Sequence, residues 1–469
     1  MLDSSAAYGG ISLWYADLPD RPLSPLPGER RYDVAIVGGG YTGLWTAYYL
    51  KQQSPDLSVC VLEAHACGFG ASGRNGGWLM AALEGEVPLI RSVDASRRSS
   101  VAAAIHSIIP EVAAVLAAES IDCGFQHGGG IYAAARYPEQ LGVQQALLAD
   151  YRSVGFTEDD ARWLDAPALR QRFNIREPLG ALYTPHIARV HPAKLVAGLL
   201  AAVQRLGVDV FEQTRALSLP PGKVVTNRGT VNADQRVVAV EGFSYELREQ
   251  RRRVLPLQSR IIATEPLSDA QWQDIGLENR EVFCDASPVI TYGQRSVDNR
   301  LVFGARGSYR YGGVPRSDFS GDGKAFEQVH QLLLDCLPQL RGVAITHKWG
   351  GTLGVARSGR AHVVVDESRG LSLAGGYGGE GVGAANLMAR SLVARMLNPE
   401  HELATMPWCH SGDPSRVLRS WEPEPLRWLG YRSINSALSL EEHVLRSGWP
   451  RWLRRPVQWV SAALQKLLN

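Results

Sequence analysis

The sequence predicts an α/β protein with two domains, one built around a parallel sheet and the other around an antiparallel sheet. Three observations support this fold class. The chain has 469 residues, which is too long for one ordinary hydrophobic core. A strand, a glycine-rich turn, a helix and a second strand follow one another from about residue 32, and strand-rich blocks return after long insertions. Such insertions typically fold into a second domain, with a cleft between the two.

The first elements are an arm and a compact βαβ unit. Residues 1–31 are rich in Pro, Gly and Ser, so we expect an arm laid over the body. Residues 32–64 then read YDVAIV, GGGYTG, LWTAYYLKQQ and, after a short turn, LSVCVLEA. This is the order strand, turn, helix, strand.

The later elements place the remaining boundaries. Residues 86–120 carry a helical apolar pattern that Pro110 breaks or kinks, and another helix begins near Pro192. Strand-rich blocks follow, and a last strand, LSLAGG, precedes a glycine-rich turn and the helix NLMARSLVARML. We divide the chain into an N-terminal arm (1–31), a discontinuous first domain (32–85, 185–245 and 345–400), a second domain (86–184 and 246–344) and a C-terminal extension (401–469).

Composition excludes several classes of protein. The 49 basic and 47 acidic residues nearly cancel, so there is no global field for gripping nucleic acid. The six cysteines are scattered, without a C-x-x-C pair or a Cys/His grouping at metal-ligand spacing, so no metal site is expected. We find no secretory signal and no apolar run approaching the ~20 residues of a membrane span. We therefore expect a cytoplasmic protein.

The glycine-rich turn is a dinucleotide-binding motif. Gly38, Gly40 and Gly43 form G-x-G-x-x-G between a strand and a helix. The three glycines allow, in turn, a tight bend, close approach of a pyrophosphate and close packing of helix against strand. Glu63 ends the second strand, where an acid binds the ribose diol. The unit predicts a Rossmann-like domain, but NAD and FAD share this fingerprint.

Two further glycine-rich segments distinguish between these cofactors. They are AHACGFGASGRNGG at 64–77 and GGYGGEGVGAANLMARSLVARML at 375–397. Together with GGGYTG, they resemble the D-amino-acid oxidase superfamily of FAD enzymes, and most of all its branch with gamma-glutamylputrescine oxidase, glycine oxidase and sarcosine oxidase. The resemblance runs from about residue 32 to about residue 400.

The resemblance implies a function and a set of cofactor residues. A small primary or secondary amine, such as an amino acid or a polyamine derivative, would lose a hydride from its α-carbon to flavin N5 and give an imine that water hydrolyses. The candidate cofactor-binding residues are Gly38, Gly40, Tyr41, Thr42, Gly43, Glu63, Ala64, Gly70, Ala71, Ser72, Arg74, Asn75, Gly76, Gly77, Ala216, Trp349, Gly376, Tyr377, Gly378, Gly379, Glu380, Gly381 and Val382.

Three positions depart from the family pattern. Arg74 stands where some relatives carry a flavin-linking histidine, and the 376–381 loop has no cysteine, so we expect FAD to be bound without a covalent bond. Glu380 replaces the usual histidine of this loop; it either binds an ammonium substrate or faces solvent, and we favour solvent. Glu241 stands where relatives carry a small residue, so its backbone is expected to diverge locally.

The candidate catalytic residues are His347, Lys348, Tyr377 and Glu380, chosen by motif position. Lys348 is of interest because a cation near the flavin promotes reaction with oxygen. Arg357 or Arg360 is a candidate to grip a carboxylate or phosphonate of the substrate. For each of these side chains we favour a purely structural role over a functional one.

The C-terminal segment 446–469 contains no acid. Its basic residues alternate with Trp449, Trp452 and Trp459. This pattern suits either a terminal helix docked on the body, which we favour, or a helix that touches a membrane. Membrane contact would favour a quinone over oxygen as the electron acceptor.

Two other functions stay open. Neighbouring branches use the same scaffold on alcohols, so an FAD-dependent 2-hydroxy acid dehydrogenase is one alternative. A non-catalytic flavin-binding subunit is the other. The identity of the amine, the electron acceptor and the oligomeric state do not follow from the residues.

Overall fold

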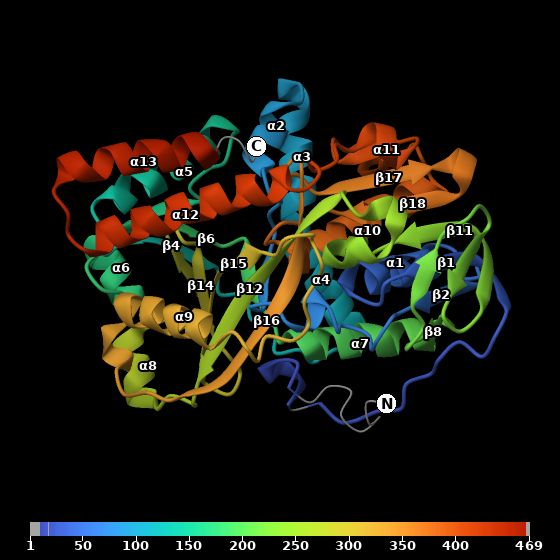
Figure 1. Cartoon of the computed structure of the whole chain (residues 1–469), viewed down its shortest axis with the longest axis horizontal. Helices are drawn as coiled ribbons and strands as arrows, with labels where there is room; N and C mark the ends of the chain where they lie inside the picture. Colours follow the sequence, from blue (N-terminus) through green and yellow to red (C-terminus); the bar gives the residue numbers. More distant parts are fainter. Residues whose placement is uncertain (1–9, 17, 466–469) are drawn as a thin grey trace.

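The computed structural model describes residues 10–16 and 18–465. Figure 1 shows two lobes side by side, each built on a large sheet. The first sheet has nine strands: β1 (Arg30–Val37), β2 (Val59–Leu62), β8 (Asp209–Phe211), β9 (Ala216–Ser218), β10 (Lys223–Thr226), β11 (Thr230–Val238), β17 (His362–Asp366), β18 (Leu371–Gly375) and β19 (Cys409–Ser411). At its centre β18, β11, β1, β2 and β8 are mutually parallel neighbours.

The second sheet has eight strands in the order β16-β12-β15-β14-β13-β4-β6-β5. All neighbours are antiparallel except β13 and β4. The strands are β4 (Gly130–Ala135), β5 (Arg162–Asp165), β6 (Pro178–Thr184), β12 (Val254–Thr264), β13 (Val282–Asp285), β14 (Thr291–Arg295), β15 (Leu301–Tyr309) and β16 (Ile345–Ala356). A short pair, β3 (Trp78–Met80) and β7 (Ile187–Arg189), accompanies the two large sheets. The predicted α/β class with one parallel-rich and one antiparallel sheet is confirmed.

The helices divide between the two lobes. They are α1 (Tyr41–Gln53), α2 (Glu86–Arg91), α3 (Arg98–His106), α4 (Ile108–Ala118), α5 (Glu139–Ser153), α6 (Ala166–Arg172), α7 (Pro192–Arg205), α8 (Asp269–Ile275), α9 (Gly323–Cys336), α10 (Gly381–Leu397), α11 (Pro414–Val417), α12 (Leu426–Arg446) and α13 (Arg451–Gln465). Local signals define several of their starts. His191 Nδ1 accepts the Lys194 N–H at 3.2 Å ahead of Pro192, and Ser268 and Gln271 form a capping box.

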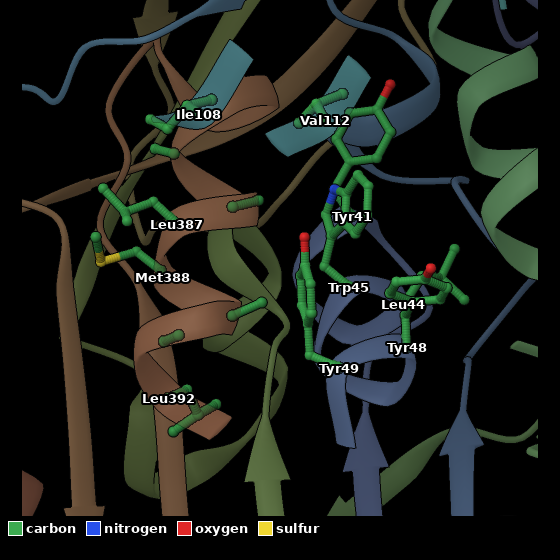
Figure 2. Close-up of a cluster of buried hydrophobic side chains, with 14 of the residues drawn as sticks. Tyr41, Leu44, Trp45, Tyr48, Tyr49, Ile108, Val112, Leu387, Met388 and Leu392 are labelled. Carbon is green, nitrogen blue, oxygen red and sulfur yellow. The ribbon is translucent and has the colours of Figure 1, made fainter. Parts of the chain in front are cut away.

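The largest core lies between α1, α10 and α4. Figure 2 shows the α1 side chains Tyr41, Trp45 and Tyr49 standing beside the α10 helix, with the α4 side chains above them. Trp45 is fully buried and stacks on Tyr49 with ring centroids 5.7 Å apart. The Asn386 amide of α10 donates a hydrogen bond to the Tyr49 hydroxyl at 2.8 Å. This packing fixes the amino ends of α1 and α10 relative to each other.

Two segments lie elsewhere than the predicted domain division placed them. Strand β16 pairs along its whole length with β12 and so belongs to the second sheet, although 345–400 was assigned to the first domain. Side chains of α2, α3 and α4 pack in the core that includes α1 and α10, although 86–184 was assigned to the second domain. The division into domains itself stays a prediction.

The segment 95–118 corrects one expectation about apolar runs. By length and composition this helical stretch is apolar enough to cross a membrane. Its Val101, Ile105, Ile108 and Val112 are buried in the first core, and 39% of its most apolar 18 residues are buried. The helix breaks at Ser107, so Pro110 falls in the first turn of α4, where its missing N–H costs little.

Candidate functional site

A cavity of about 580 Å³ lies between the two sheets. Its walls come from the β1–α1 turn, the segment 62–76, the end of β11, the β18–α10 loop, strands β12, β14, β15 and β16, and helix α12. Parts of the chain that are far apart in sequence therefore meet around one space.

Close packing requires glycine at two positions of the β1–α1 turn. Gly38 has φ +112°, and a Cβ there would lie 2.4 Å from the Ala239 carbonyl oxygen. A Cβ at Gly43 would lie 1.9 Å from the Gly38 carbonyl oxygen. These distances are below any real Cβ contact, so the turn packs tightly against Ala239, which follows β11, and against the first turn of α1. The amino end of α1 opens on the cavity, and its N-cap residue, Gly40, has no side chain that could cap it.

Glu63 holds the end of β2 beside this turn. Its carboxylate accepts the N–H of Gly39 at 2.8 Å and the N–H of His65 at 2.9 Å. Burial raises the pKa of this carboxyl to about 7, and the two backbone donors oppose the shift. Glu63 lines the cavity next to the amino end of α1.

The segment 68–77 is braced from several sides. Ser72 Oγ accepts the Tyr41 N–H at 3.0 Å. From the N-terminal arm, Trp14 Nε1 donates to the Asn75 carbonyl at 2.8 Å. Trp14 itself is buried against the rings of His191 and Trp349. The arm is therefore part of the structure that fixes this loop.

Arg74 is a structural residue of the same loop. Its guanidinium donates to the carbonyls of Phe69, Ser317 and Gly350 at 2.8, 2.9 and 3.1 Å. Burial lowers the pKa of Arg74 to about 10. Although Arg74 lines the cavity, these donors bind protein carbonyls.

The β18–α10 loop forms the opposite wall. Tyr377 and Thr42 share a hydroxyl hydrogen bond of 2.8 Å, which ties the loop to α1. The Glu241 carboxylate accepts the N–H of Gly376 at 3.2 Å and that of Tyr377 at 3.0 Å. Glu241 has φ +44°, and the predicted local divergence from relatives stays a prediction. Helix α10 begins at Gly381 on the cavity, also without a side-chain cap.

These features fit FAD. Two helix amino ends that are not capped by their own N-cap side chains face one cavity, and helix amino ends favour anionic groups such as a pyrophosphate. The glycines let a ligand approach the backbone closely, and Glu63 offers an acceptor for ribose hydroxyls.

The cavity brings together most of the predicted cofactor residues. Those that line it are Gly38, Gly40, Tyr41, Thr42, Glu63, Ala64, Gly70, Ala71, Ser72, Arg74, Asn75, Gly76, Ala216, Tyr377, Gly378, Gly379, Glu380, Gly381 and Val382. Gly43, Gly77 and Gly376 lie behind the wall, where added Cβ atoms would strike neighbouring atoms. That the lining residues bind the cofactor stays a prediction.

Several predicted side chains lie outside the cavity. His347, Lys348 and Trp349 line a small separate hollow beside Leu13, so the structure does not support placing the first two at a catalytic centre or Trp349 beside the cofactor. Arg357 pairs with Glu422 at 3.0 Å, and Arg360 does not reach the cavity either.

Other lining residues carried no motif and were missed. Arg306 is on β15, Tyr292 on β14 and Tyr132 on β4, while Glu84 follows β3. The first three come from strands spread over the second sheet and Glu84 from the segment after β3, and only the folded topology brings them to the site.

Helix α12 was also missed as part of the site. Its Tyr431, Ile434, Asn435 and Leu438 line the cavity, and the helix crosses the second lobe in Figure 1. Buried Arg136 joins α12 to the second sheet, because it pairs with Glu442 at 3.3 Å and with Asp285 at 2.5 Å.

Glu380 does not face open solvent, which corrects the favoured expectation. The residue is partly buried and lines the cavity, and its Oε2 is buried without a hydrogen-bond partner within the described chain. Glu84 lies beside the same loop, since a Cβ at Gly378 would lie 2.7 Å from Glu84 Oε2. Burial raises the pKa of both carboxyls, and the charge of Glu84 raises that of Glu380 further.

Outside the cavity, one group has ligand atoms close enough for a metal ion. In the described chain, ligand atoms of His106, Asp160 and His186 lie within 4.8 Å of one another, a proximity invisible in sequence spacing. The two imidazoles stack with centroids 3.7 Å apart, and His186 Nε2 lies 3.0 Å from Asp160 Oδ1. His106 Nδ1 lies 3.6 Å from the same Asp160 oxygen, so only the His186 contact is within hydrogen-bond distance of that atom.

Comparison with known proteins agrees with this architecture. A family described as FAD dependent oxidoreductase matches residues 33–396. The chain is similar to the probable oxidoreductase OrdL of Rhizobium meliloti, with 31% identity over 84% of this chain and 90% of that protein. It is also similar to gamma-glutamylputrescine oxidoreductase of Escherichia coli, with 29% identity over 81% and 87%.

Solved structures share the fold. Glycine oxidase from Bacillus cereus superposes with a TM-score of 0.65 at 18% identity, covering 80% of this chain and 98% of that one. L-amino acid deaminase from Proteus vulgaris gives 0.64 at 17% identity, covering 87% and 99%. The part of the chain after residue 396, including α12, lies outside the family match.

Proposed function

The chain belongs to the FAD-dependent oxidoreductases of the D-amino-acid oxidase family, and on this premise we propose that it oxidises the carbon–nitrogen bond of a small amine to an imine, which water then hydrolyses. The observation that carries the proposal is the continuity of the cavity. One part of this space is lined by the β1–α1 turn, the segment 62–76 and the β18–α10 loop, and we call it the cradle. The other part is lined by the second sheet and α12, and we call it the chamber.

Different residues of the cradle would hold different parts of FAD. The amino end of α1, with Gly38 and Gly40, would receive the pyrophosphate, and Glu63 would bind the ribose. The amino end of α10 would stabilise negative charge on the ring system. When bound, FAD supplies the acceptor for the hydride that leaves the carbon next to nitrogen.

The chain's own residues orient the substrate and exclude water. Tyr292 and Tyr132 from the second sheet and Leu438 from α12 line the chamber. Their aromatic and aliphatic surfaces suit the carbon skeleton of a small amine. Among relatives, one is named for gamma-glutamylputrescine, which supports an amine substrate.

We also propose that FAD is held without a covalent bond. Arg74 stands at the linking position known from some relatives, and it is occupied with protein carbonyls. The loop 376–381 contains no cysteine. Denaturation with acid should therefore release the flavin into the supernatant.

An anaerobic screen tests the proposed reaction. Purified protein is titrated with amines, amino acids and 2-hydroxy acids while the absorbance of oxidised flavin is followed. We expect bleaching by amines and no bleaching by hydroxy acids. Bleaching by hydroxy acids alone would replace amine oxidation with alcohol oxidation, and no bleaching by any compound would indicate a flavin-binding subunit.

Helix α13 supports a second proposal, peripheral contact with a membrane. The structure docks this helix on the body, as favoured from the sequence, through α12 and an Arg454–Glu139 pair of 3.1 Å. Its outer face nevertheless exposes Trp452 by 71% and Trp459 by 75%. Exposed Arg455 adds positive charge to this face. Tryptophan beside arginine on one helix face suits the surface of an anionic bilayer. A quinone would then be an available electron acceptor.

Vesicle sedimentation tests this contact. We expect the full chain to co-sediment with vesicles that contain phosphatidylglycerol and to be released by salt, because part of the attraction is electrostatic. The double variant Trp452→Ser/Trp459→Ser should stay in the supernatant. Val143→Ser, which removes an exposed apolar side chain of α5, is the control and should behave like wild type. Equal sedimentation of all three proteins would overturn the proposal.

A further inference from the structure

The chamber beyond the cradle contains two carboxyl groups that no ion pair neutralises within the described chain. Glu84 and Glu380 both line it, and neither has a salt bridge to Lys, Arg or His among the described residues. Glu84 belongs to the segment between β3 and α2, whereas Glu380 precedes the first turn of α10. Two unrelated elements thus bring like charges to the same wall.

The geometry shows that the two groups are neighbours. The Glu84 carboxyl lies against the backbone of Gly378, two residues before Glu380. The pKa of Glu380 is raised first by burial, then by the charges of Glu84 and Glu86. Like charges at close range are unfavourable unless a proton or a bound cation neutralises one of them. Their arrangement therefore has an energetic cost that a bound cation would offset.

A second, independent observation points to a ligand. The Glu380 Oε2 atom is withdrawn from solvent and has no hydrogen-bond partner among the described residues. A buried acceptor left unsatisfied costs free energy. A donor that enters the cavity, such as an N–H of a substrate ammonium, would satisfy it.

The arginines that line the cavity form no salt bridge with Glu84 or Glu380 among the described residues, so the two carboxyl groups can bind a ligand. Arg306 lines the same space and acts on Glu84 at longer range, since it lowers the pKa of Glu84 against the larger effect of burial. Arg74 is directed at protein carbonyls. Two carboxyls thus face one arginine.

We propose that Glu84 and Glu380 form an acidic subsite that binds an ammonium group of the substrate, and that this subsite selects alkylamines over α-amino acids. The inference rests on the proposed amine oxidation and names its substrate class. An ammonium group donates hydrogen bonds to both carboxylates. A carboxylate on the adjacent carbon of an amino acid would meet the same pair as a like charge and be disfavoured.

Three isosteric probes test this subsite without any reaction. tert-Butylamine is a cation, tert-butanol is neutral, and 2-aminoisobutyrate adds a carboxylate beside the amine. None has hydrogen on the carbon that bears the amine or hydroxyl, so none is a hydride donor. Isothermal titration calorimetry of each with the FAD-loaded protein gives binding free of turnover.

We expect tert-butylamine to bind wild type about tenfold or more tightly than either other probe, as for a desolvated charge pair. Glu84→Gln and Glu380→Gln should each weaken tert-butylamine about tenfold and leave tert-butanol unchanged. Glu400→Gln removes an exposed carboxylate and is the matched control. FAD content and thermal melting of each variant report folding; if one variant fails to fold, the other still decides the outcome.

The outcomes separate this inference from the proposed function. Tight binding of 2-aminoisobutyrate by wild type, or unchanged binding of tert-butylamine by the glutamine variants, overturns the acidic subsite even when amines bleach the flavin. Selective binding of tert-butylamine, combined with no bleaching by any amine, overturns amine oxidation and leaves the subsite standing.

Discussion

Glu241 is the residue at which the two halves of the cradle are joined. It follows β11 in a left-handed conformation, and its carboxylate accepts two N–H groups of the β18–α10 loop. By accepting these two hydrogen bonds, the buried carboxylate of Glu241 links the central sheet to the loop before α10. A small residue at this position would leave those N–H groups without this acceptor.

The pH dependence of stability tests this role. Burial raises the pKa of Glu241 from 4.5 to about 7 in the folded chain. Between these values the folded state holds a proton that the unfolded state has lost, so stability falls as pH rises through this window. Glu241→Gln should therefore show a smaller drop in melting temperature of the apoprotein between pH 5 and pH 8 than wild type shows, as measured by calorimetry.

The comparison needs a control for charge alone. Glu400→Gln removes an exposed carboxylate and should keep the wild-type slope. Glu63 and Glu86 have similarly raised pKa values, so part of the slope remains in Glu241→Gln. If the melting temperatures of the two variants changed equally with pH, the result would contradict the linking role of Glu241.

At the scale of residues, the sequence predicted more of the residues that line the cradle than of those that line the chamber. Gly38 and Gly40 could be placed because their task is local, within one turn. His347 and Lys348 were placed from their nearness to a motif. They lie at the far end of β16, whereas Thr352 and Val355 of the same strand line the cavity. A strand advances about 3.3 Å per residue, so a few positions separate a site residue from a remote one.

At the scale of elements, α12 is the part of the cavity wall that the sequence did not predict. It lies beyond the matched region and still supplies part of the chamber wall. No role was predicted for residues 426–446, because the space that this helix closes depends on contacts with β15 and β12, which are remote in sequence. Pairing with Arg136 fixes the far end of the helix.

Two leucines on this helix test how it is docked. Leu438 is 3% exposed and Leu440 is 50% exposed. Leu438→Ala should lower the free energy of unfolding by about 2–5 kcal/mol, because it removes buried methyl groups and leaves a void. Leu440→Ala should change it by less than about 0.5 kcal/mol. Urea unfolding followed by circular dichroism measures both, and equal effects would show that α12 does not pack as described.

At the scale of the whole molecule, the order of elements predicted two sheets of different type, and the structure has them. The boundary between them was not predictable, because β16 continues directly into the turn before β17 and so passes from one sheet to the other. Strand-to-strand pairing across long insertions is set by the tertiary fold. The cavity lies at that crossing, and each sheet contributes part of its wall.

The position of α12 has a consequence for biosynthesis. Because Tyr431 and Leu438 complete the chamber wall, a growing polypeptide that has not reached α12 has the glycine-rich cradle but an open chamber. The enclosure can form only after the ribosome has released the chain through Leu438. Termination of translation before Tyr431 would thus leave the chamber open to water.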